Sequence, residues 1–139
     1  MNLKIEPMKR SNAIIILNEF IEKRLTKKKW YNDIKNYIFA MLFYGSVAKG
    51  LNRPDSDIDM LIILPLEIET KYTKGEYVYH YKKQEINIVL RSIERLRTIA
   101  NEQNDKFQAE VFKKSEILWE RDNEVRKLLE RISQISKEQ

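Results

Sequence analysis

Two aspartates in the first half of the sequence, Asp57 and Asp59, stand two residues apart and directly precede an apolar run. In a β-strand, residues i and i+2 point to the same face and lie about 7 Å apart along the strand. Two carboxylates at that spacing repel each other unless a cation lies between them. Hard oxygen ligands of this kind suit Mg²⁺, whose coordination phosphate oxygens and water can complete. Asp57 and Asp59 are therefore candidate metal ligands and catalytic residues.

A Gly-Ser pair, Gly45-Ser46, follows an earlier apolar run and could hold a phosphate. Glycine allows the backbone to approach a phosphate without a Cβ clash. Amide groups at the start of a short helix, together with the Ser46 hydroxyl, could donate to an anion. Lys49 and Arg53 lie between this pair and the aspartates, where their charges could steady phosphates; a solvated loop charge explains each of them equally well.

A third polar pair, Glu85 and Asn87, lies on a later apolar segment and again has a spacing of two. Both side chains would share one face of a strand. If that strand lies beside the strand that begins at Asp57, one of the two side chains can complete the metal site.

Each of these patterns alone is more often structural than functional. A Gly-Ser pair after a strand is usually a turn, and an Asp-x-Asp at a strand start is usually a solvated edge or a helix cap. Here, however, ten residues (47–56) separate the Gly-Ser pair from the aspartates, and an apolar run flanks each side. That combination predicts a phosphate cradle facing a pair of metal-binding carboxylates.

The residues from Phe43 to Gly50 and from Ser56 to Ile62 resemble the signature of the DNA polymerase β-like nucleotidyltransferase superfamily, and within it the minimal nucleotidyltransferases. The resemblance implies transfer of a nucleoside monophosphate from an NTP, with ATP and AMP expected, to an acceptor, with release of pyrophosphate. It implies that Gly45 and Ser46 hold the triphosphate, and that Asp57 and Asp59 hold two Mg²⁺ ions. A third carboxylate on a neighbouring strand would serve as ligand or base.

The sequence departs from the family pattern at this third carboxylate. Ile86-Asn87-Ile88 has the expected apolar flanks but carries Asn where the family has an acid. Glu85 is the nearest acid, and alternation places it on the same face. We therefore predict that Glu85 is the third catalytic and metal-binding residue; the alternative is a site without its base, slow or inert.

The resemblance also suggests what the partner is. Minimal nucleotidyltransferases often pair with a small helical HEPN-type protein as the antitoxin of a toxin–antitoxin system, and they can attach AMP to that protein. Two alternatives stay open: a binding module for nucleotide or protein without turnover, and a small antibiotic-modifying nucleotidyltransferase. A homo-oligomer is also open.

The pattern of apolar residues predicts a single α/β domain over residues 1–139, with a core of about 11–135 and a mixed sheet flanked by helices. We expect strands over 38–43, 57–64, 77–81, 85–90 and 116–120, the second of them in the middle of the sheet. We expect helices over 11–28, over 92–103 with Ser92 as N-cap, from Asp105, and after Asp122.

Several aromatic residues and the single histidine have mainly structural interpretations. Tyr77, Tyr79 and Tyr81 alternate, so they share a face and are expected to pack across strands; stacking on a base is the alternative. His80 is interpreted as a strand-surface residue, and Trp30 and Trp119 as packing residues.

Composition favours a folded cytoplasmic protein. Hydrophobic residues make up 42% of the 139 residues, there is no cysteine, and no apolar run is long enough to span a bilayer. The net charge is +5, which suits anionic partners. The lysines are scattered, however, and runs such as 27–29 and 82–83 are typical of solvated helix ends and turns. A nucleic-acid surface is therefore not the favoured interpretation.

Overall fold

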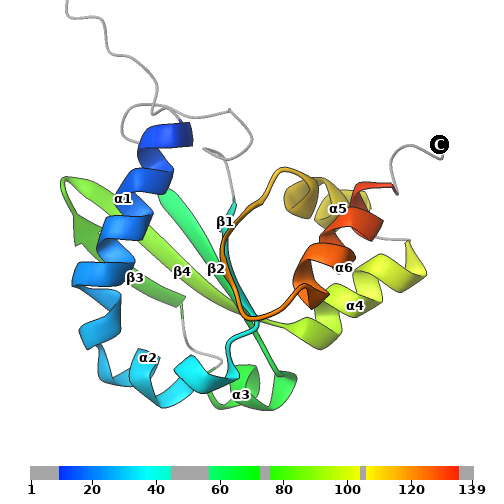
Figure 1. Cartoon of the computed structure of the whole chain (residues 1–139), viewed down its shortest axis with the longest axis horizontal. Coiled ribbons are helices and arrows are strands. Elements are labelled where there is room, and N and C mark those ends of the chain that lie inside the picture. Colours follow the sequence, from blue (N-terminus) through cyan, green and yellow to red (C-terminus); the bar gives the residue numbers. More distant parts are fainter. Residues whose placement is uncertain (1–9, 45–56, 73–75, 104–105, 135–139) are drawn as a thin grey trace, which may run out of the picture.

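One mixed β-sheet with helices against both faces organises the described part of the chain (Figure 1). The computed structural model describes residues 10–44, 57–72, 76–103 and 106–134. Its strands are β1 (Ala40–Tyr44), β2 (Ile58–Leu64), β3 (Glu76–Tyr81), β4 (Gln84–Ser92) and β5 (Glu116–Glu120). Its α-helices are α1 (Arg10–Lys23), α2 (Lys29–Ile34), α3 (Leu66–Lys71), α4 (Ile93–Glu102), α5 (Lys106–Lys113) and α6 (Glu124–Ser133). The predicted α/β class with a mixed sheet is confirmed.

The strand order is β3-β4-β2-β1-β5, so β2 lies at the centre as predicted. β2 pairs in parallel with β4, and the other three pairings are antiparallel. Every residue of β2 except Asp59 is buried. A strand that is apolar on both faces is stable only when both faces are covered, which explains its central place.

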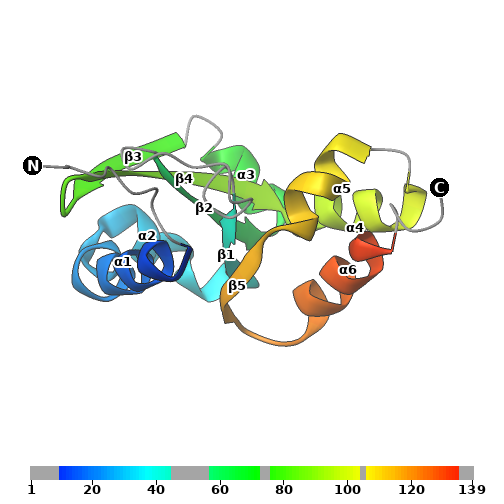
Figure 2. The same cartoon turned by 90° about the horizontal axis from the view of Figure 1, so that it is seen from above.

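The alternation of β2 divides the core into two layers (Figure 2). Ile58, Met60 and Ile62 face one cluster, which α1 and α2 cover. Leu61 and Ile63 face a second cluster, which α4, α5 and α6 cover. Asp57 and Asp59 precede Leu61 in the same alternation, so they point to the face that α4, α5 and α6 cover further along the sheet.

The predicted hairpin joins β3 and β4 through a tight turn at Lys82 and Lys83. Both residues have positive φ, 50° and 65°. Two consecutive residues of this kind match the twist of a two-residue hairpin, a position where Asn-Gly is more usual. The loop is one residue shorter than expected, because Gln84 already pairs with Tyr81 in the ladder.

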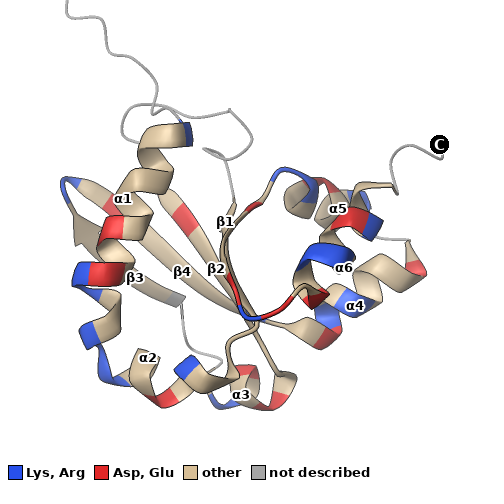
Figure 3. Cartoon of the chain, viewed as in Figure 1, with Lys and Arg blue, Asp and Glu red and all other residues tan. Residues whose placement is uncertain are grey.

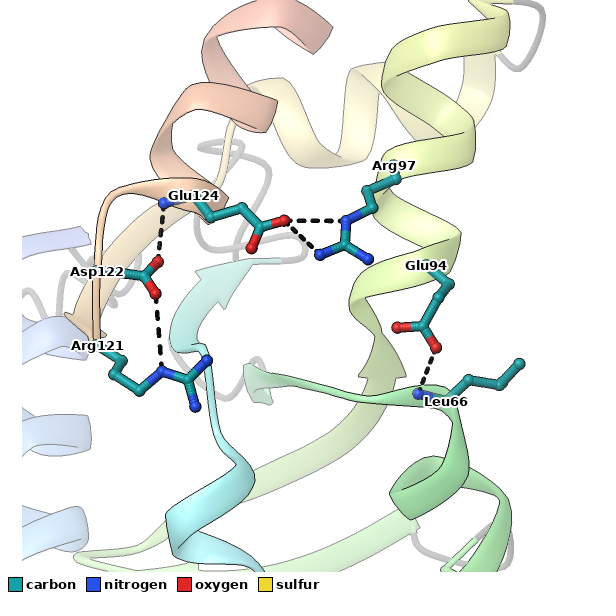
Figure 4. A network of polar contacts seen from close by, with 6 residues as sticks. All are labelled: Leu66, Glu94, Arg97, Arg121, Asp122 and Glu124. Atoms are coloured by element: carbon teal, nitrogen blue, oxygen red, sulfur yellow. Dashed lines mark hydrogen bonds and ion pairs between the residues drawn. The ribbon is translucent and has the colours of Figure 1, made fainter.

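Hydrogen bonds support two predicted helix starts. The Ser92 cap is confirmed, whereas the N-cap position of α6 is Asn123, one residue after the predicted Asp122. The Ser92 hydroxyl accepts from the backbone N–H of Arg95 and caps α4, which contributes about 1 kcal/mol in typical proteins. Asp122 Oδ1 accepts from the N–H of Glu124 at 2.9 Å, at the start of α6. Glu124 in turn pairs with Arg97, which ties α6 to α4 (Figure 4). The predicted cap at Asp105 lies outside the described residues.

The first predicted helix, over 11–28, is too long. α1 ends at Lys23, and a 3-10 turn (Leu25–Lys27) and α2 follow. Side chains satisfy the backbone there: Thr26 Oγ1 donates to the carbonyl of Glu22, and Asn32 Nδ2 donates to the carbonyls of Thr26 and Lys28. Such local bonds compete with a continuing helix, and apolar periodicity alone does not reveal them.

Apolar periodicity does not predict α3. This helix begins directly after Pro65, whose extended backbone ends β2. Its first N–H, on Leu66, is satisfied by Glu94 Oε2 at 2.7 Å, a residue of α4 (Figure 4). A cap that comes from 28 residues away has no local sequence signal.

Candidate active site

The parallel pairing of β2 and β4 brings the predicted polar residues together. Asp59 lies opposite Asn87, and Ile58 lies opposite Ile86. Both isoleucines are fully buried on the opposite face, which fixes the register. The expectation that the Glu85–Asn87 strand lies beside the aspartate strand is confirmed.

The amide of Asn87 bridges the two aspartates. Its Nδ2 lies 3.2 Å from Asp57 Oδ2 and 3.4 Å from Asp59 Oδ1. Asp57 is exposed and Asp59 is half-buried. A neutral amide in this place donates to both carboxylates but cancels neither charge, so the pair retains its mutual repulsion.

Asp59 is the member of this pair whose negative charge is disfavoured by its surroundings. Burial raises the pKa of its carboxyl to about 6, and the negative charges of Asp57 and Glu85 add to the rise. The hydrogen bond from Asn87 acts in the opposite direction but does not outweigh them. A cation that enters the site would therefore stabilise the ionised form of Asp59.

A cavity of about 340 Å³ opens at this pair. It is lined by Asp57, Asp59, Val78, Glu85, Asn87, Ile88 and Val89. Glu85 therefore shares the cavity with both aspartates. Its role as the third metal ligand and catalytic acid stays a prediction. Its Oε1 also lies 3.7 Å from His80 Nε2 on the neighbouring strand. Within the four described stretches, no group of three or more acidic, His or Cys side chains is close enough to hold a metal ion.

The predicted phosphate-binding residues Gly45, Ser46, Lys49 and Arg53 lie outside the described residues. The last described residue before them, Tyr44, is the register partner of Asp59. β1 therefore ends directly beside the carboxylate pair. The roles of the four phosphate-binding residues stay predictions.

The chain matches the family model described as "Polymerase beta, Nucleotidyltransferase" over residues 21–124. This chain belongs to the polymerase β nucleotidyltransferase family. The matched range includes both aspartates, Glu85 and Asn87, so the site described above lies wholly within the family domain. No curated protein matches the chain.

Two solved structures resemble this nucleotidyltransferase domain. A nucleotidyltransferase-like protein from Exiguobacterium sibiricum 255-15 is 12% identical, with a TM-score of 0.50. That alignment covers 84% of this chain and 38% of that one, so the chain spans well under half the length of this relative. A toxin–antitoxin structure with AMP-PNP is 13% identical, with a TM-score of 0.42 over 79% of this chain and 83% of the other. At such identities, the first likeness supports the fold alone.

The tyrosines of this domain pack away from the site. The ring of Trp30 stacks on Tyr77 at 3.9 Å, and its Nε1–H donates to the hydroxyl of Tyr79 at 2.7 Å. Phe20 contacts the rings of Tyr79 and Tyr81. The packing interpretation of Trp30 and the three tyrosines is confirmed. The packing interpretation of Trp119 is wrong, because this side chain of β5 is 43% exposed. His80 is exposed on the opposite face, as predicted.

Sequence reasoning missed the bridging role of Asn87 and the contribution of Val78. Val78 is the register partner of Asn87 and is 51% exposed, although it is apolar. The alternation of β3 carried the signal: if Tyr77, Tyr79 and Tyr81 face the core, Val78 and His80 face the site.

The donor chemistry of this site fits a divalent cation. Two carboxylates lie together, one of them half-buried with a raised pKa, and both are hard oxygen donors.

A larger cavity, of about 420 Å³, lies between α5, β5 and α6, away from these carboxylates. None of the described helices is long and apolar enough to cross a membrane.

Proposed function

We propose that this domain transfers a nucleoside monophosphate, AMP from ATP, to an acceptor hydroxyl in a Mg²⁺-dependent reaction. The observation that carries the proposal is the Asp57–Asp59 pair at the start of the central strand, where both carboxylates accept from Asn87 and the pKa of Asp59 is raised to about 6. A protein gains no stability from such a pair. Its presence in a nucleotidyltransferase-family domain is explained if a cation and a triphosphate bind there.

In the proposed reaction, the acceptor oxygen forms a bond to the α-phosphorus while the bond to the bridging oxygen breaks and pyrophosphate leaves. Bound Mg²⁺ would lower the pKa of the acceptor hydroxyl and neutralise the charge on the leaving group. Asp57 and Asp59 hold the cation. Glu85 accepts the acceptor's proton, because the amide of Asn87 has no basic site at neutral pH.

The triphosphate side of the proposal rests on residues that follow β1. Gly45 and Ser46 would bind the phosphates through backbone amides and a hydroxyl, and Lys49 and Arg53 would neutralise their charge. Support comes from the end of β1. Tyr44, the residue that precedes Gly45, is the register partner of Asp59.

The acceptor that we propose is a Tyr, Ser or Thr hydroxyl on a HEPN-type helical partner protein, with this chain acting as an antitoxin. The support is the resemblance of residues 43–50 and 56–62 to the minimal nucleotidyltransferases. The subfamily assignment is part of this proposal.

A second candidate function is a nucleotide-binding module without turnover. The observation that favours it is Asn87, whose amide donates to both aspartates from the place where the family carries an acid. In this function the domain would bind Mg²⁺ and nucleotide but would not activate an acceptor.

One experiment separates these functions. The chain is incubated with α-labelled ATP, Mg²⁺ and any co-purified partner, and released pyrophosphate and intact masses are measured. We expect the partner to gain one or more AMP units, and the Asp59→Asn variant to give none. Mg²⁺-dependent ATP binding without pyrophosphate release would favour the binding module. Nucleotide appearing on an antibiotic or an RNA instead would overturn the protein acceptor.

A further inference from the structure

Two lysine-rich segments that are far apart in the sequence form one basic face in the fold. Figure 3 shows their blue segments on the lower half of α1, on the turn that follows it, and at the β3–β4 turn, all on one side of the molecule. We define this basic face by its seven cations: Lys23, Arg24, Lys27, Lys28, Lys29, Lys82 and Lys83.

Ion pairs and ring contacts join the two segments. Glu19 pairs with Lys23 at 3.0 Å and with Lys82 at 2.7 Å, so one acid links α1 to the hairpin turn. Arg24 and Lys82 both lie over the ring of Tyr81, at 5.6 and 5.9 Å from its centroid. The Lys28 ammonium lies 4.8 Å from the centroid of Tyr79. The face is therefore a built arrangement rather than a chance overlap of two loops.

The basic face carries the whole net charge of the chain. Residues 19–29 and 82–83 contain these seven cations and only two acids, Glu19 and Glu22, for a net charge of +5. The rest of the chain has 19 basic and 19 acidic residues, and these cancel. A local potential of this kind attracts a polyanion over a distance of about 8–10 Å at physiological salt.

We propose that the basic face docks the phosphate backbone of duplex RNA. Six of the seven cations are lysines, a residue type that is depleted from protein–protein interfaces but common against phosphates. The side chains of Lys23 and Lys82 are 61% and 55% exposed, so they can reach a backbone while they stay paired to Glu19.

The tyrosine rings argue against a single strand. Single-strand binders stack bases on exposed aromatic rings. Tyr81 is only 8% exposed, and Phe20, Arg24 and Lys82 surround its ring. Trp30 stacks on Tyr77 and donates to Tyr79, so these rings serve packing. The basic face therefore offers charge without a stacking platform.

The arrangement of the cations favours RNA over DNA. One row lies on the hairpin turn, at Lys82 and Lys83, and the other runs along 23–29. The two segments meet at Glu19, which pairs with both Lys23 and Lys82. A compact group of cations of this kind suits the closely spaced phosphates on either side of the narrow major groove of A-form RNA. α1 contributes only its last turn to the basic face and packs on the core through Ala13, Leu17 and Phe20, so it does not present a helix along its length to the wide major groove of B-form DNA.

The test compares two triple variants with the same change in charge. The first, Lys27→Gln/Lys29→Gln/Lys83→Gln, removes exposed cations of the basic face. The second, Lys71→Gln/Lys106→Gln/Lys127→Gln, removes exposed cations elsewhere. Fluorescence anisotropy measures binding to a labelled RNA duplex of about 20 base pairs, longer than the roughly 16 that a small double-stranded-RNA module spans. DNA of the same sequence and single-stranded RNA are the competitors, and circular dichroism confirms the fold of each variant.

We expect the first variant to bind duplex RNA more weakly by about tenfold or more at low salt, with a salt slope smaller by about 1 for each lysine–phosphate pair that the substitutions remove. The second variant is expected to stay within about threefold of the parent chain, and duplex RNA to outcompete the other two nucleic acids. Equal weakening in both variants would overturn the proposal, because net charge alone would then explain binding. Equal or better binding of DNA or of the single strand, or no binding of duplex RNA by the parent chain, would also overturn it.

Discussion

Two acidic centres flank the β3–β4 hairpin, and the fold treats them in opposite ways. Glu19 accepts from the Tyr81 hydroxyl at 2.8 Å and pairs with Lys82 and Lys23. These bonds, that of Lys82 foremost, hold its pKa at about 2. Asp59 has no cationic partner among the described residues, and burial raises its pKa to about 6. One acid is satisfied within the chain, whereas the other stays unsatisfied until something binds.

This contrast separates stability from function. A satisfied carboxylate stabilises the fold, and here it fastens the hairpin to α1. An unsatisfied pair costs stability, and such costs concentrate where a ligand repays them. Substitutions at the two centres should therefore have opposite effects on the stability of the metal-free protein.

The largest effect is expected on catalysis at the aspartate pair. Asp57→Asn and Asp59→Asn should each lower nucleotide transfer by about 10³-fold or more, since several kcal/mol of metal-dependent charge stabilisation is lost. Pyrophosphate release with α-labelled ATP measures this. Asp33→Asn, on the surface of α2, is the matched control and should keep full activity. Activity of Asp59→Asn close to that of the parent chain would remove the metal role from this residue.

The second effect concerns the missing acid. Glu85→Gln should lower turnover by about 10²-fold, within the usual range for loss of a general base, and Asn87→Ala should lower it less. Single-turnover rates at saturating ATP and Mg²⁺ measure both. If Asn87→Asp raises activity sharply while Glu85→Gln changes nothing, Glu85 is not the base, and the natural site is a degenerate one.

The sequence predicted the buried parts of this molecule better than its exposed polar connections. The apolar runs placed β2 at the centre, and the two-residue periods put Asp57, Asp59, Glu85 and Asn87 on one face. The interactions that the sequence did not reveal are set by tertiary structure: the Glu94 cap of α3, and the Asn87 bridge. Local patterns carry no information about which distant side chain meets which backbone group.

The same limit explains why the sequence does not reveal that the two lysine runs lie close together in the fold. In sequence, the runs 27–29 and 82–83 are two ordinary solvated segments. The hairpin brings them together only because the Lys82–Lys83 turn reaches Glu19 on α1. The placement of Asp57, Asp59, Glu85 and Asn87 around one cavity could thus be predicted from spacing, whereas the basic face depends on a pairing that spacing does not encode.

A third, smaller effect is expected on stability at the site. Because the folded-state pKa of Asp59 is raised, its contribution to the free energy of unfolding should fall as pH rises from about 4 to about 6. The side chain is partly exposed, so screening reduces the cost to about 1 kcal/mol at neutral pH. Asp59→Asn should therefore raise the melting temperature of the metal-free protein at pH 7. Thermal melting at pH 7 measures this shift. Urea unfolding of the parent chain and of Asp59→Asn at pH 4.5 and 7 measures how the free energy of unfolding depends on pH.

Magnesium provides the internal control for this effect. Mg²⁺ should stabilise the parent chain at pH 7 and should have little effect on Asp59→Asn. A variant that unfolds more easily than the parent chain under both conditions would mean that Asp59 supports the fold.

The smallest effect is expected at Glu19, and its sign is opposite. The folded-state pKa of Glu19 is lowered to about 2 from an ordinary value of 4.5. Its contribution is therefore complete above about pH 4.5 and is lost as pH falls toward 2. Glu19→Gln should lower the melting temperature at pH 7 modestly, because the ion pairs with Lys23 and Lys82 are solvent-exposed and salt-screened.

Glu22→Gln removes the same charge from α1 without touching the hairpin, so it should leave the loss of stability at acid pH unchanged. Melting curves from pH 2 to 7 at low and high salt compare the two variants. A loss of stability at acid pH that is unchanged in size in Glu19→Gln would show that Glu19 does not set the acid dependence of stability, and the contrast between the two acidic centres would then rest on Asp59 alone.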